Sequence, residues 1–423
     1  MKKKYESFMC YVWYRICTSL HYRTVFAPGM GSLYRYYQNI RIKQIRKKPI
    51  IKVLFIVGEA STWKSEILFR RMLEHPKFNP ILGITESLDV PGSKAILLEY
   101  IKKMGYEYVD LDDKFNSISR INPDIKFYYK PYEFNYRHGL YFDFNMKSLV
   151  CSIDYSFNLG CGAIAFKHEI RRYAWKEFVE NETVVDAIKN AGKYYGNKVV
   201  TGLPLQDILS IPKDCYRDPW KGDKSRKRII YAPHHSFKGT NSHYIEYATF
   251  LDFGEFMLDM ANKYADKVQW VFKPHPSLRV KLYDIWGEER TNAYYKEWEN
   301  LPNAQVELGA YNDFFMYSDA MIHDSSSFII EYMYTNNPVL FLEYETYTAE
   351  QMHVSSFGYD AYKAHYHATS KSQIENFILK VIEGVDVKKA ERISFFENYL
   401  RIPNGKTACD NIMDIILGYE TNK

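Results

Sequence analysis

The sequence predicts an α/β protein with two domains, each built on an open parallel sheet. The chain has 423 residues, which is too long for one ordinary core and about right for two. Apolar runs that end at glycine or proline alternate with stretches of helical periodicity, the pattern of strands and helices in a parallel sheet. Apolar residues make up 46% and charged residues 25% of the chain, which excludes a disordered protein.

The first half begins this alternation with a strand over residues 50–57, an almost continuous apolar run that ends at Gly58. Such runs, bounded by glycine, are typical of buried parallel strands. Ser61 or Thr62 can then cap a helix that runs to about Glu74. Because one glycine alone follows the strand, a dinucleotide-binding fingerprint is excluded there. The alternation continues with strands predicted at residues 80–84, 124–129 and 197–204 and a helix predicted at residues 93–104.

Two strands of the second half end in imidazole and ammonium side chains. A strand over residues 228–232 leads into His234 and His235, and the next predicted strand ends at Lys273 and His275. The prolines on either side of His275 restrict the backbone and help to fix the direction of its ring. In isolation, His234 can simply face solvent, and the segment around His275 can be a rigid loop.

A third strand end is rich in hydroxyl groups. It leads through Asp324 into a predicted helix over residues 328–334, which contains Glu331. A helix N-terminus carries about half a positive charge and free N–H donors, so hydroxyl groups there form a phosphate cradle without a glycine-rich loop. By itself such a run is also an ordinary helix cap, and Glu331 can accept hydrogen bonds from a ribose. The hydroxyl groups belong to Ser325, Ser326 and Ser327.

The three strand ends are expected at one edge of the sheet. Ligands of open α/β sheets bind beyond the carboxyl ends of the strands, which would place His235, His275 and the serine run along one crevice. Lys273 and the imidazoles can there add positive charge or proton donation to bound phosphates. The spacing of His, Asp and Glu indicates no metal site, and no Gly-x-Ser-x-Gly elbow indicates a hydrolase.

Residues 1–48 form a basic and aromatic arm. They hold 11 Lys or Arg and one acid, whereas the rest of the chain holds 45 basic and 50 acidic residues. Tyr and Trp favour a headgroup layer, and each cation near an anionic surface contributes about 1 kcal/mol. We expect the arm to lie on an anionic membrane surface without crossing it, because no run approaches about 20 apolar residues. The alternatives are a helix packed on its own domain through its rings and, less favoured, an arm that binds nucleic acid.

The cysteines indicate a reducing compartment. None of the six lies in a Cys-x-x-Cys pair, and their spacing suits neither a zinc site nor a small disulfide framework. Scattered cysteines fit the cytoplasm, and the N-terminus does not have the pattern of a secretory signal. The positions are Cys10, Cys17, Cys151, Cys161, Cys215 and Cys409.

At these residues the sequence resembles the CDP-glycerol glycerophosphotransferase family, the teichoic-acid primases and polymerases and related capsule enzymes. The strand end at residues 231–233 is similar to the family's Tyr-Ala-Pro, and residues 274–275 to its Pro-His motif. Residues 324–331 are similar to an Asp-x-Ser-Ser-x-x-x-Asp/Glu motif. Residues 200–209 resemble the family's Thr-Gly-x-Pro-x-x-Asp-x-Leu segment, and residues 396–415 its closing segment.

The resemblance implies a GT-B architecture, in which two Rossmann-like domains face each other across a cleft, here with a basic aromatic helical arm at the N-terminus. Together with the basic aromatic composition of the first 48 residues, it divides the chain into four parts: a membrane-associating arm, an acceptor domain, a nucleotide-donor domain and a C-terminal helical segment. Their expected bounds are 1–48, 49–205, 206–395 and 396–423.

The resemblance also implies roles for the candidate site residues. His275, Ser326 and Ser327 would bind the donor pyrophosphate, Glu331 would lie near the cytidine ribose, and Asp324 would shape the turn. The other expected donor-binding residues are Lys273, His234 and Ser325, and His235 joins His275 as a catalytic candidate. Polymerases of this family carry a histidine in the first domain that is thought to activate the acceptor, but the comparable residues 155–163 contain none. The candidate bases are Glu59 and His168.

Together these observations predict a transferase. It would move glycerol phosphate, or a similar polyol phosphate, from a CDP-activated donor to a hydroxyl of a lipid-linked cell-surface glycan and release CMP. Stabilising the charge on the leaving phosphate is the main requirement, and we expect neither a metal nor another cofactor. The alternatives are a GT-B glycosyltransferase that uses a nucleotide sugar and a non-catalytic polymer-binding scaffold. We expect the protein to bind its donor, its glycan acceptor and the inner face of the cell membrane, peripherally and from the cytoplasm, and not to bind nucleic acid.

Overall fold

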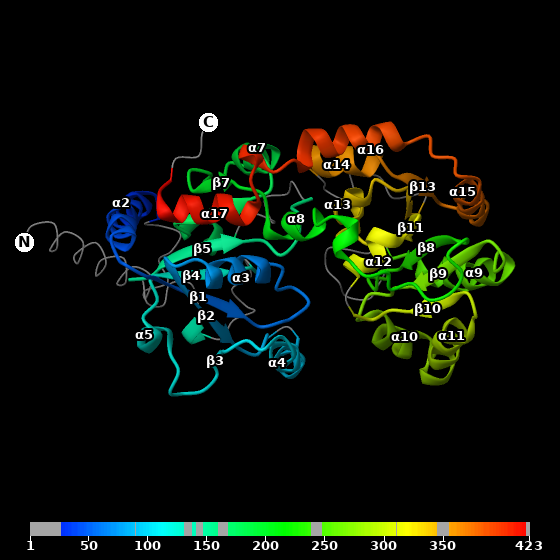
Figure 1. The fold of residues 1–423 in the computed structure, drawn as a ribbon, viewed down its shortest axis with the longest axis horizontal. Coiled ribbons are helices and arrows are strands. Elements are labelled where there is room, and N and C mark those ends of the chain that lie inside the picture. Colours follow the sequence, from blue (N-terminus) through cyan, green and yellow to red (C-terminus); the bar gives the residue numbers. More distant parts are fainter. Residues whose placement is uncertain are drawn as a thin grey trace, which may run out of the picture. The chain divides into compact units, whose positions relative to one another are not determined.

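The chain folds as two compact units, each with its own parallel sheet (Figure 1). The first unit lies within Met1–Asn158, Gly162–Ile208 and Ile402–Lys423, and the second within Leu159–Cys161 and Leu209–Arg401. Of residues 27–33 only the backbone is described. A computed structural model describes residues 27–88, 90–130, 138–140, 147–159, 168–237, 248–309, 311–344 and 355–419.

The first unit is built on a sheet with the strand order β3-β2-β1-β4-β5-β6-β7, and all its strand pairs are parallel. β1 lies inside the sheet because its apolar run is buried on both faces. The chain adds β2 and β3 on one side of β1 and then β4 to β7 on the other, so the order reverses between β1 and β4. The strands are β1 (Ile51–Val57), β2 (Phe78–Ile84), β3 (Val109–Asp110), β4 (Ile125–Tyr128), β5 (Leu149–Ile153), β6 (Lys176–Val179) and β7 (Lys198–Val200).

One of the two helices predicted in the first unit has the expected bounds, and the other begins later than expected. α4 (Ser93–Met104) has the predicted bounds. α3 (Glu66–Glu74) begins later than predicted, because the buried ring of Trp63 packs on Phe69 and the segment before the helix forms tight turns. The predicted cap at Ser61 or Thr62 is therefore wrong. The other helices are α5 (Ile118–Ile121), α6 (Glu169–Tyr173), α7 (Glu182–Asn190), α8 (Pro204–Leu209) and α17 (Ala408–Leu417).

Helix α2 (Ala27–Arg46) belongs to the N-terminal arm, and two of its three described rings turn inward, whereas Tyr36 is exposed. Tyr34 and Tyr37 are buried in the core of the first unit, and Gln38 Nε2 donates a hydrogen bond to the carbonyl of Tyr173 at 2.8 Å. The end of the arm thus packs on its own domain. The membrane contact expected of the arm falls partly on residues 1–26, which lie outside the described residues.

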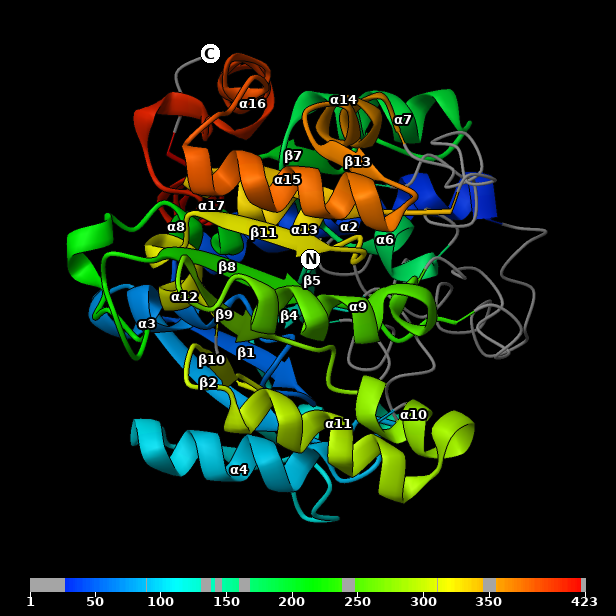
Figure 2. The same ribbon diagram turned by 90° about the vertical axis from the view of Figure 1, so that its right-hand side faces the viewer.

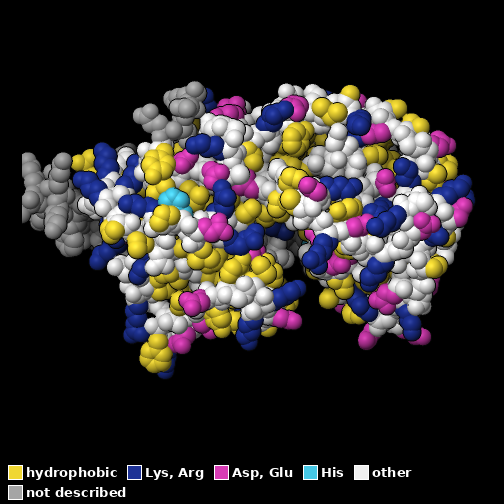
Figure 3. Space-filling view, in the orientation of Figure 1, with side chains coloured by type: hydrophobic (Ala, Val, Ile, Leu, Met, Phe, Trp, Pro, Cys, Tyr) yellow, Lys and Arg dark blue, Asp and Glu magenta, His cyan; other side chains and the backbone are white. Residues whose placement is uncertain are grey.

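Several cations of α2 and of the residues just after it are also bound to the first unit. Arg41 and Lys48 both pair with the buried carboxylate of Asp124, at 3.2 and 2.6 Å. Arg46 donates to the last carbonyls of α17, Ile415 and Ile416, where a cation complements the negative end of the helix dipole. Lys and Arg side chains gather around α2 in the space-filling view (Figure 3). Among the described residues, no helix combines the length and the apolar character that crossing a membrane requires.

The end of the chain returns to the first unit through Asp207. Its Oδ1 and Oδ2 atoms accept the backbone N–H groups of Ala408 and Cys409, at 2.7 and 2.9 Å, and so satisfy the free donors at the start of α17. Gly202 has a φ of +77°, and a Cβ there would lie 3.1 Å from Ala408 Cβ. Residues 200–209 therefore form the surface on which the C-terminal helix α17 packs.

The second unit repeats the doubly wound pattern. Its sheet has the order β10-β9-β8-β11-β12-β13, again with all pairs parallel, and the order reverses between β8 and β11. β8, β9 and β11 confirm the three strands that the sequence places before its motifs. The two sheets confirm the predicted pair of Rossmann-like α/β domains. The strands are β8 (Lys227–Ala232), β9 (Val268–Phe272), β10 (Ala304–Val306), β11 (Ala320–His323), β12 (Val339–Leu342) and β13 (Tyr366–Ala368).

Aromatic side chains fill the core of the second unit. The ring of Phe272 on β9 stacks on Trp298 at a centroid distance of 5.0 Å, and Tyr231 on β8 lies 5.8 Å from Phe272. α9 and α15 pack against each other and against strands of this sheet (Figure 2). The main helices are α9 (Phe250–Lys263), α10 (Leu278–Trp286), α11 (Glu288–Asn300), α12 (Asn312–Tyr317), α14 (Ser356–Lys363), α15 (Lys371–Glu383) and α16 (Lys389–Phe395).

The helix predicted after the serine run is shorter and less regular than expected. α13 covers Phe328–Glu331, and a 3-10 helix, η4 (Tyr332–Thr335), replaces its continuation. η4 ends at Asn336, which has a left-handed φ of 54° two residues before Pro338. A short helix has a weak macrodipole, so donor groups must do more of the work of binding a phosphate here than the helix dipole.

Candidate active site

Three histidine rings lie together where β8 and β9 end. His234 and His235 follow β8, His275 follows β9, and the backbone N–H of His275 donates to the carbonyl of Pro233 at 2.9 Å. The ring centroids are 4.4 Å apart for His234 and His235, 4.8 Å for His234 and His275, and 4.0 Å for His235 and His275. The sequence expectation that these residues share one place is therefore met within the second unit.

A repeated His-x-Ser arrangement fixes the direction of the rings. In three such segments the Nδ1 atom of the histidine accepts the backbone N–H of the serine two residues later, which assigns the proton of a neutral ring to Nε2. Each Nε2–H is then a hydrogen-bond donor. The pairs are His234 with Ser236 at 3.3 Å, His275 with Ser277 at 3.1 Å and His323 with Ser325 at 3.2 Å.

The clustered imidazoles are neutral at physiological pH. Burial, and then the neighbouring His275 and His235, lower the pKa of His234 to about 2. Burial, and then His235 and Lys273, lower the pKa of His275 to about 3, and burial with Lys281 lowers the pKa of His235 to about 4. The rings thus offer N–H donors, and the positive charge expected at this place comes from Lys273.

Asp324 joins the end of β11 to the end of β8. Its carboxyl group is fully buried and accepts the backbone N–H of His234 at 2.6 Å. It also accepts the N–H and the hydroxyl of Thr249, at 2.6 and 3.0 Å. Burial, opposed by these hydrogen bonds, raises the pKa of Asp324 to about 6. Both carboxyl oxygens are used inside the protein, so Asp324 shapes the edge of the site.

The serine run lies at the same edge, after β11. Ser325 is buried, Ser326 is half-buried and Ser327 is exposed. Ser327 precedes α13 without capping it through its hydroxyl. Exposure therefore increases along the run from Ser325 to Ser327, and Ser326 and Ser327 are accessible to a ligand.

Lys273 and Glu331 are linked through a tyrosine that the sequence reading did not include. The Nζ atom of Lys273 lies 5.3 Å from the ring centroid of Tyr311, and the hydroxyl of Tyr311 donates to Glu331 Oε2 at 2.6 Å. Glu331 is buried. Glu331, the acid expected near a ribose, thus already accepts a hydrogen bond from Tyr311. A bound ribose would share the Glu331 carboxylate with the Tyr311 hydroxyl.

Among the described residues, His234, His235 and His275 form a group whose side chains lie close enough together to hold a metal ion. Their candidate ligand atoms lie within 4.8 Å of one another. Two of the rings already use Nδ1 to accept a backbone N–H. A metal would need the lone pair of the other nitrogen and hence the opposite tautomer, so the arrangement suits an anion better.

The corresponding edge of the first unit carries a buried ion pair. Glu59, which follows β1, pairs with Lys130, which follows β4, and Ser87 Oγ donates to Glu59 Oε1 at 2.6 Å. The hydroxyl of Tyr129 accepts the backbone N–H of Gly58 at 2.8 Å. The first expected base therefore lies where the strand order reverses, with an ammonium group against its carboxylate.

The second expected base lies elsewhere in the first unit. His168 immediately precedes α6 and lines a pocket that does not include Glu59. The pocket is cationic and is also lined by Arg171, Arg172, Lys193, Tyr194 and Lys198. Glu59 and His168 are thus not brought to one place by any contact among the described residues.

The sequence model of the CDP-Glycerol:Poly(glycerophosphate) glycerophosphotransferase family matches residues 162–418. The chain belongs to this family. It is accordingly an enzyme of the glycerophosphotransferase class. No curated protein sequence matches it.

Solved structures with the same two-domain GT-B fold include transferases and epimerases. The wall teichoic acid polymerase TagF matches at a TM-score of 0.58 and 16% identity, over 97% of this chain and 97% of that one. The MnaA–UDP complex of S. aureus matches at 0.57 and 16%, over 88% and 99%. The UDP-GlcNAc 2-epimerase of Neisseria meningitidis, bound to UDP-GlcNAc, matches at 0.57 and 16%, over 87% and 100%. At these identities the likeness establishes the fold.

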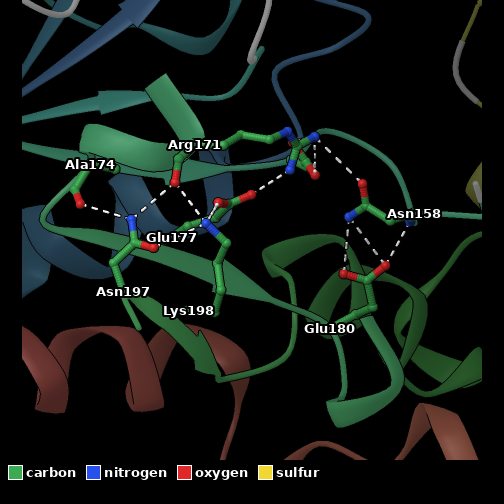
Figure 4. Close-up of polar contacts among 8 residues, drawn as sticks. Asn158, Arg171, Ala174, Glu177, Glu180, Asn197 and Lys198 are labelled. Atoms are coloured by element: carbon green, nitrogen blue, oxygen red, sulfur yellow. Dashed lines mark hydrogen bonds and ion pairs between the residues drawn. The ribbon is translucent and has the colours of Figure 1, made fainter. Parts of the chain in front are cut away.

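Sequence reasoning missed a buried polar network in the first unit of this glycerophosphotransferase (Figure 4). Arg171 on α6 pairs with Asp154 at 2.9 Å and with Glu177, and Lys198 also pairs with Glu177, at 2.6 Å. Burial alone would raise the pKa of Glu177, but Lys198 and Arg171 lower it. The signal was present in residues 176–180, where two acids flank a short apolar pair and hide strand β6.

A second carboxyl group of this region has no cation within ion-pair distance among the described residues. Glu180, directly after β6, accepts the backbone N–H of Asn158 at 2.6 Å and its side-chain amide at 3.3 and 3.4 Å (Figure 4). Burial raises the pKa of Glu180 to about 7. It is therefore a carboxyl group that can change its charge near neutral pH.

Proposed function

We propose that this enzyme transfers glycerol phosphate, or a similar polyol phosphate, from a CDP-activated donor to a hydroxyl of a lipid-linked cell-surface glycan of the teichoic acid or capsule type. CMP leaves. The family supports the transferase and its donor class, and a variant of the neighbour TagF has been soaked with CDPG. The location that follows is the cytoplasmic face of the cell membrane, with residues 1–48 as the contact.

The observation that supports the donor site is the set of hydrogen-bond donors at the carboxyl ends of β8, β9 and β11. Nε2–H groups of His234 and His275, the hydroxyls of Ser326 and Ser327 and the ammonium of Lys273 offer hydrogen bonds and one charge to a diphosphate. Such donors need no reorganisation when charge moves onto the leaving phosphate.

The transfer is an in-line displacement at phosphorus. The acceptor oxygen loses its proton to a base of the first unit and bonds to the β-phosphorus, while the bond from that phosphorus to the CMP oxygen breaks. The electron pair of that bond stays on CMP, whose charge the donor set stabilises. Glu59 and His168 are the bases expected from the sequence, and His235 and His275 lie on the donor side.

A nucleotide sugar is the alternative donor. The likeness to UDP-GlcNAc 2-epimerases shows that two domains of this fold also hold uridine nucleotides. Thermal unfolding with CDP-glycerol, CDP-ribitol and UDP-GlcNAc separates the two, because a ligand at 100 times its Kd stabilises by about 2.7 kcal/mol. Stabilisation by UDP-GlcNAc alone would favour the glycosyltransferase.

Transfer itself separates the enzyme from a polymer-binding scaffold. Labelled CDP-glycerol, incubated with the protein and membranes that carry the acceptor, should yield labelled glycan and CMP. Donor binding without transfer to any lipid-linked acceptor would favour the scaffold, and failure to bind a cytidine nucleotide would refute the proposed donor.

A further inference from the structure

The acceptor hydroxyl needs a base, and the carboxyl groups at the edge of the first sheet differ in their fitness for this role. Glu59 is paired with Lys130, and Asp154 with Arg171. Glu180 has hydrogen bonds from Asn158 and no cation within ion-pair distance among the described residues. Residues 155–163 contain no histidine. A carboxylate held by a cation is a weaker base than one held by neutral donors.

The geometry points to Glu180 as the general base that takes the proton of the acceptor hydroxyl, with Asn158 as the residue that positions its carboxyl group. This inference rests on the proposed function. The proton passes from the acceptor oxygen to a Glu180 carboxyl oxygen, the acceptor oxygen bonds to the β-phosphorus, and the bond from phosphorus to CMP breaks.

The two kinds of contact from Asn158 have different strengths. Its backbone N–H lies 2.6 Å from Glu180 Oε1, whereas its amide nitrogen lies 3.4 and 3.3 Å from the two oxygens. The short bond fixes the carboxyl group, and the long ones are weak. An acceptor O–H that replaces the amide would make a stronger hydrogen bond to the same oxygen, in the direction needed for proton transfer.

The surroundings keep this carboxyl group ready to accept a proton near neutral pH. Burial is the main cause of the raised pKa, and Asp154, directly after β5, adds to it. On α6, Arg171 approaches the Asn158 oxygen at 3.5 Å, but Asp154 and Glu177 already hold that guanidinium. Lys198 on β7 also pairs with Glu177. The two cations and the two carboxylates of this network have a net charge of zero, so burial is what sets the pKa of Glu180.

Steady-state transfer from CDP-glycerol, measured from pH 5.5 to 9, tests the inference. In the wild type, kcat should fall on the acid side with an apparent pKa near 7. Glu180→Gln should lower kcat by about 10² to 10⁴-fold while its Kd for CDP-glycerol stays within twofold. Asn158→Ala should shift the acid limb to higher pH, because the amide hydrogen bond lowers the pKa of Glu180. Glu182→Gln, an exposed acid two residues away, is the control and should behave as the wild type.

The outcomes separate this inference from the proposed function. A wild type that binds no CDP-glycerol overturns both. A wild type that transfers, with a Glu180→Gln variant that keeps kcat within threefold and an intact acid limb, overturns Glu180 alone. Should Glu180→Gln fail to fold, Glu180→Asp and Asn158→Ala decide: an acid limb unmoved in both overturns the inference, and a moved limb supports it.

Discussion

The Oδ1 atom of Asp324 accepts the backbone N–H of His234 at 2.6 Å, which ties the carboxyl end of β11 to that of β8. The same carboxyl group holds Thr249 through Oδ2. One buried side chain thus sets the spacing between the histidine cluster and the serine run, the two halves of the proposed donor site.

Asp324→Asn should destabilise the second unit. An amide keeps one acceptor oxygen but turns an NH₂ group toward a backbone N–H, which leaves a buried donor unpaired and costs about 2 to 3 kcal/mol. Urea unfolding measures the loss. The control is Asp319→Asn, at the start of β11, where the remaining oxygen can still accept the Arg228 N–H and the side chain is partly exposed. Equal stability of Asp324→Asn and the wild type would contradict the role of Asp324.

His275→Ala should reduce transfer by at least about 10²-fold, because it removes a donor to the leaving phosphate. The fold should persist, since the ring is only half-buried. The comparison of kcat/KM with the melting temperature separates the two effects. Ser277→Ala is the matched control, because its contact with His275 comes from the backbone N–H and survives the change. Activity of His275→Ala within a few-fold of wild type would remove His275 from the donor site.

The stability of the second unit should fall as the pH is lowered from 7 to 5. The pKa of His234 is about 2 in the folded protein because of burial and of the neighbouring histidines, against about 6.5 in the unfolded chain. The unfolded chain therefore binds more protons in this range. The free energy of unfolding drops by up to about 1.4 kcal/mol per pH unit for each such ring.

Urea titrations at pH 7, 6 and 5 check this prediction. Asp324, whose pKa burial raises to about 6, opposes the trend, so the decisive quantity is the difference between wild type and His234→Asn. The variant should show the shallower loss. Parallel losses in both proteins would mean that His234 is not held neutral.

Asp207→Ala should loosen the docked C-terminal helix. Two N–H donors at the start of α17 lose their acceptor, which costs about 1 to 2 kcal/mol. Asp410→Ala serves as the control on the same helix, since its partner Arg71 is a surface cation and such pairs contribute about 0 to 1 kcal/mol. The denaturant midpoint of Asp207→Ala should be clearly lower than that of Asp410→Ala. A larger loss of stability in Asp410→Ala would contradict the role of Asp207 in holding α17.

Removal of residues 1–26 should weaken binding to anionic vesicles while the fold persists. These residues hold five Lys or Arg and one acid, and each cation near the surface contributes about 1 kcal/mol. The cut leaves Tyr34 and Tyr37 in the core, which a deletion of residues 1–48 would remove. Cosedimentation with anionic and with neutral vesicles measures the effect, and unchanged binding to the anionic ones would refute the membrane role.

Much of the fold could be predicted from local pattern. β1, β8, β9 and β11 are apolar runs with clear ends, and their motifs fall at the carboxyl edge because parallel sheets place them there. Strand β6 was missed, because Glu177 is buried in it by pairing with Arg171 and Lys198. A pairing of that kind depends on tertiary neighbours, which a single sequence does not reveal.

The sequence predicted which residues lie at the candidate donor site better than it predicted their charges and hydrogen bonds. His235 and His275 are in contact as expected, but the sequence could not show that burial keeps their rings neutral. Glu331 was expected to be available to a ribose, and its contact with Tyr311 comes from a residue 20 positions earlier. Glu180 gave no signal, because its raised pKa is a consequence of burial and not of residue type.

The central claim is that neutral imidazole N–H groups, serine hydroxyls and Lys273 bind the diphosphate of a cytidine nucleotide. Calorimetric titration of CDP-glycerol into wild type, His275→Ala and Ser277→Ala at pH 6 and pH 8 tests it most directly. We expect the wild type and Ser277→Ala to bind equally at both pH values, and His275→Ala to bind at least tenfold more weakly. Equal binding by His275→Ala, or wild-type binding that strengthens as His275 becomes protonated, would contradict the claim.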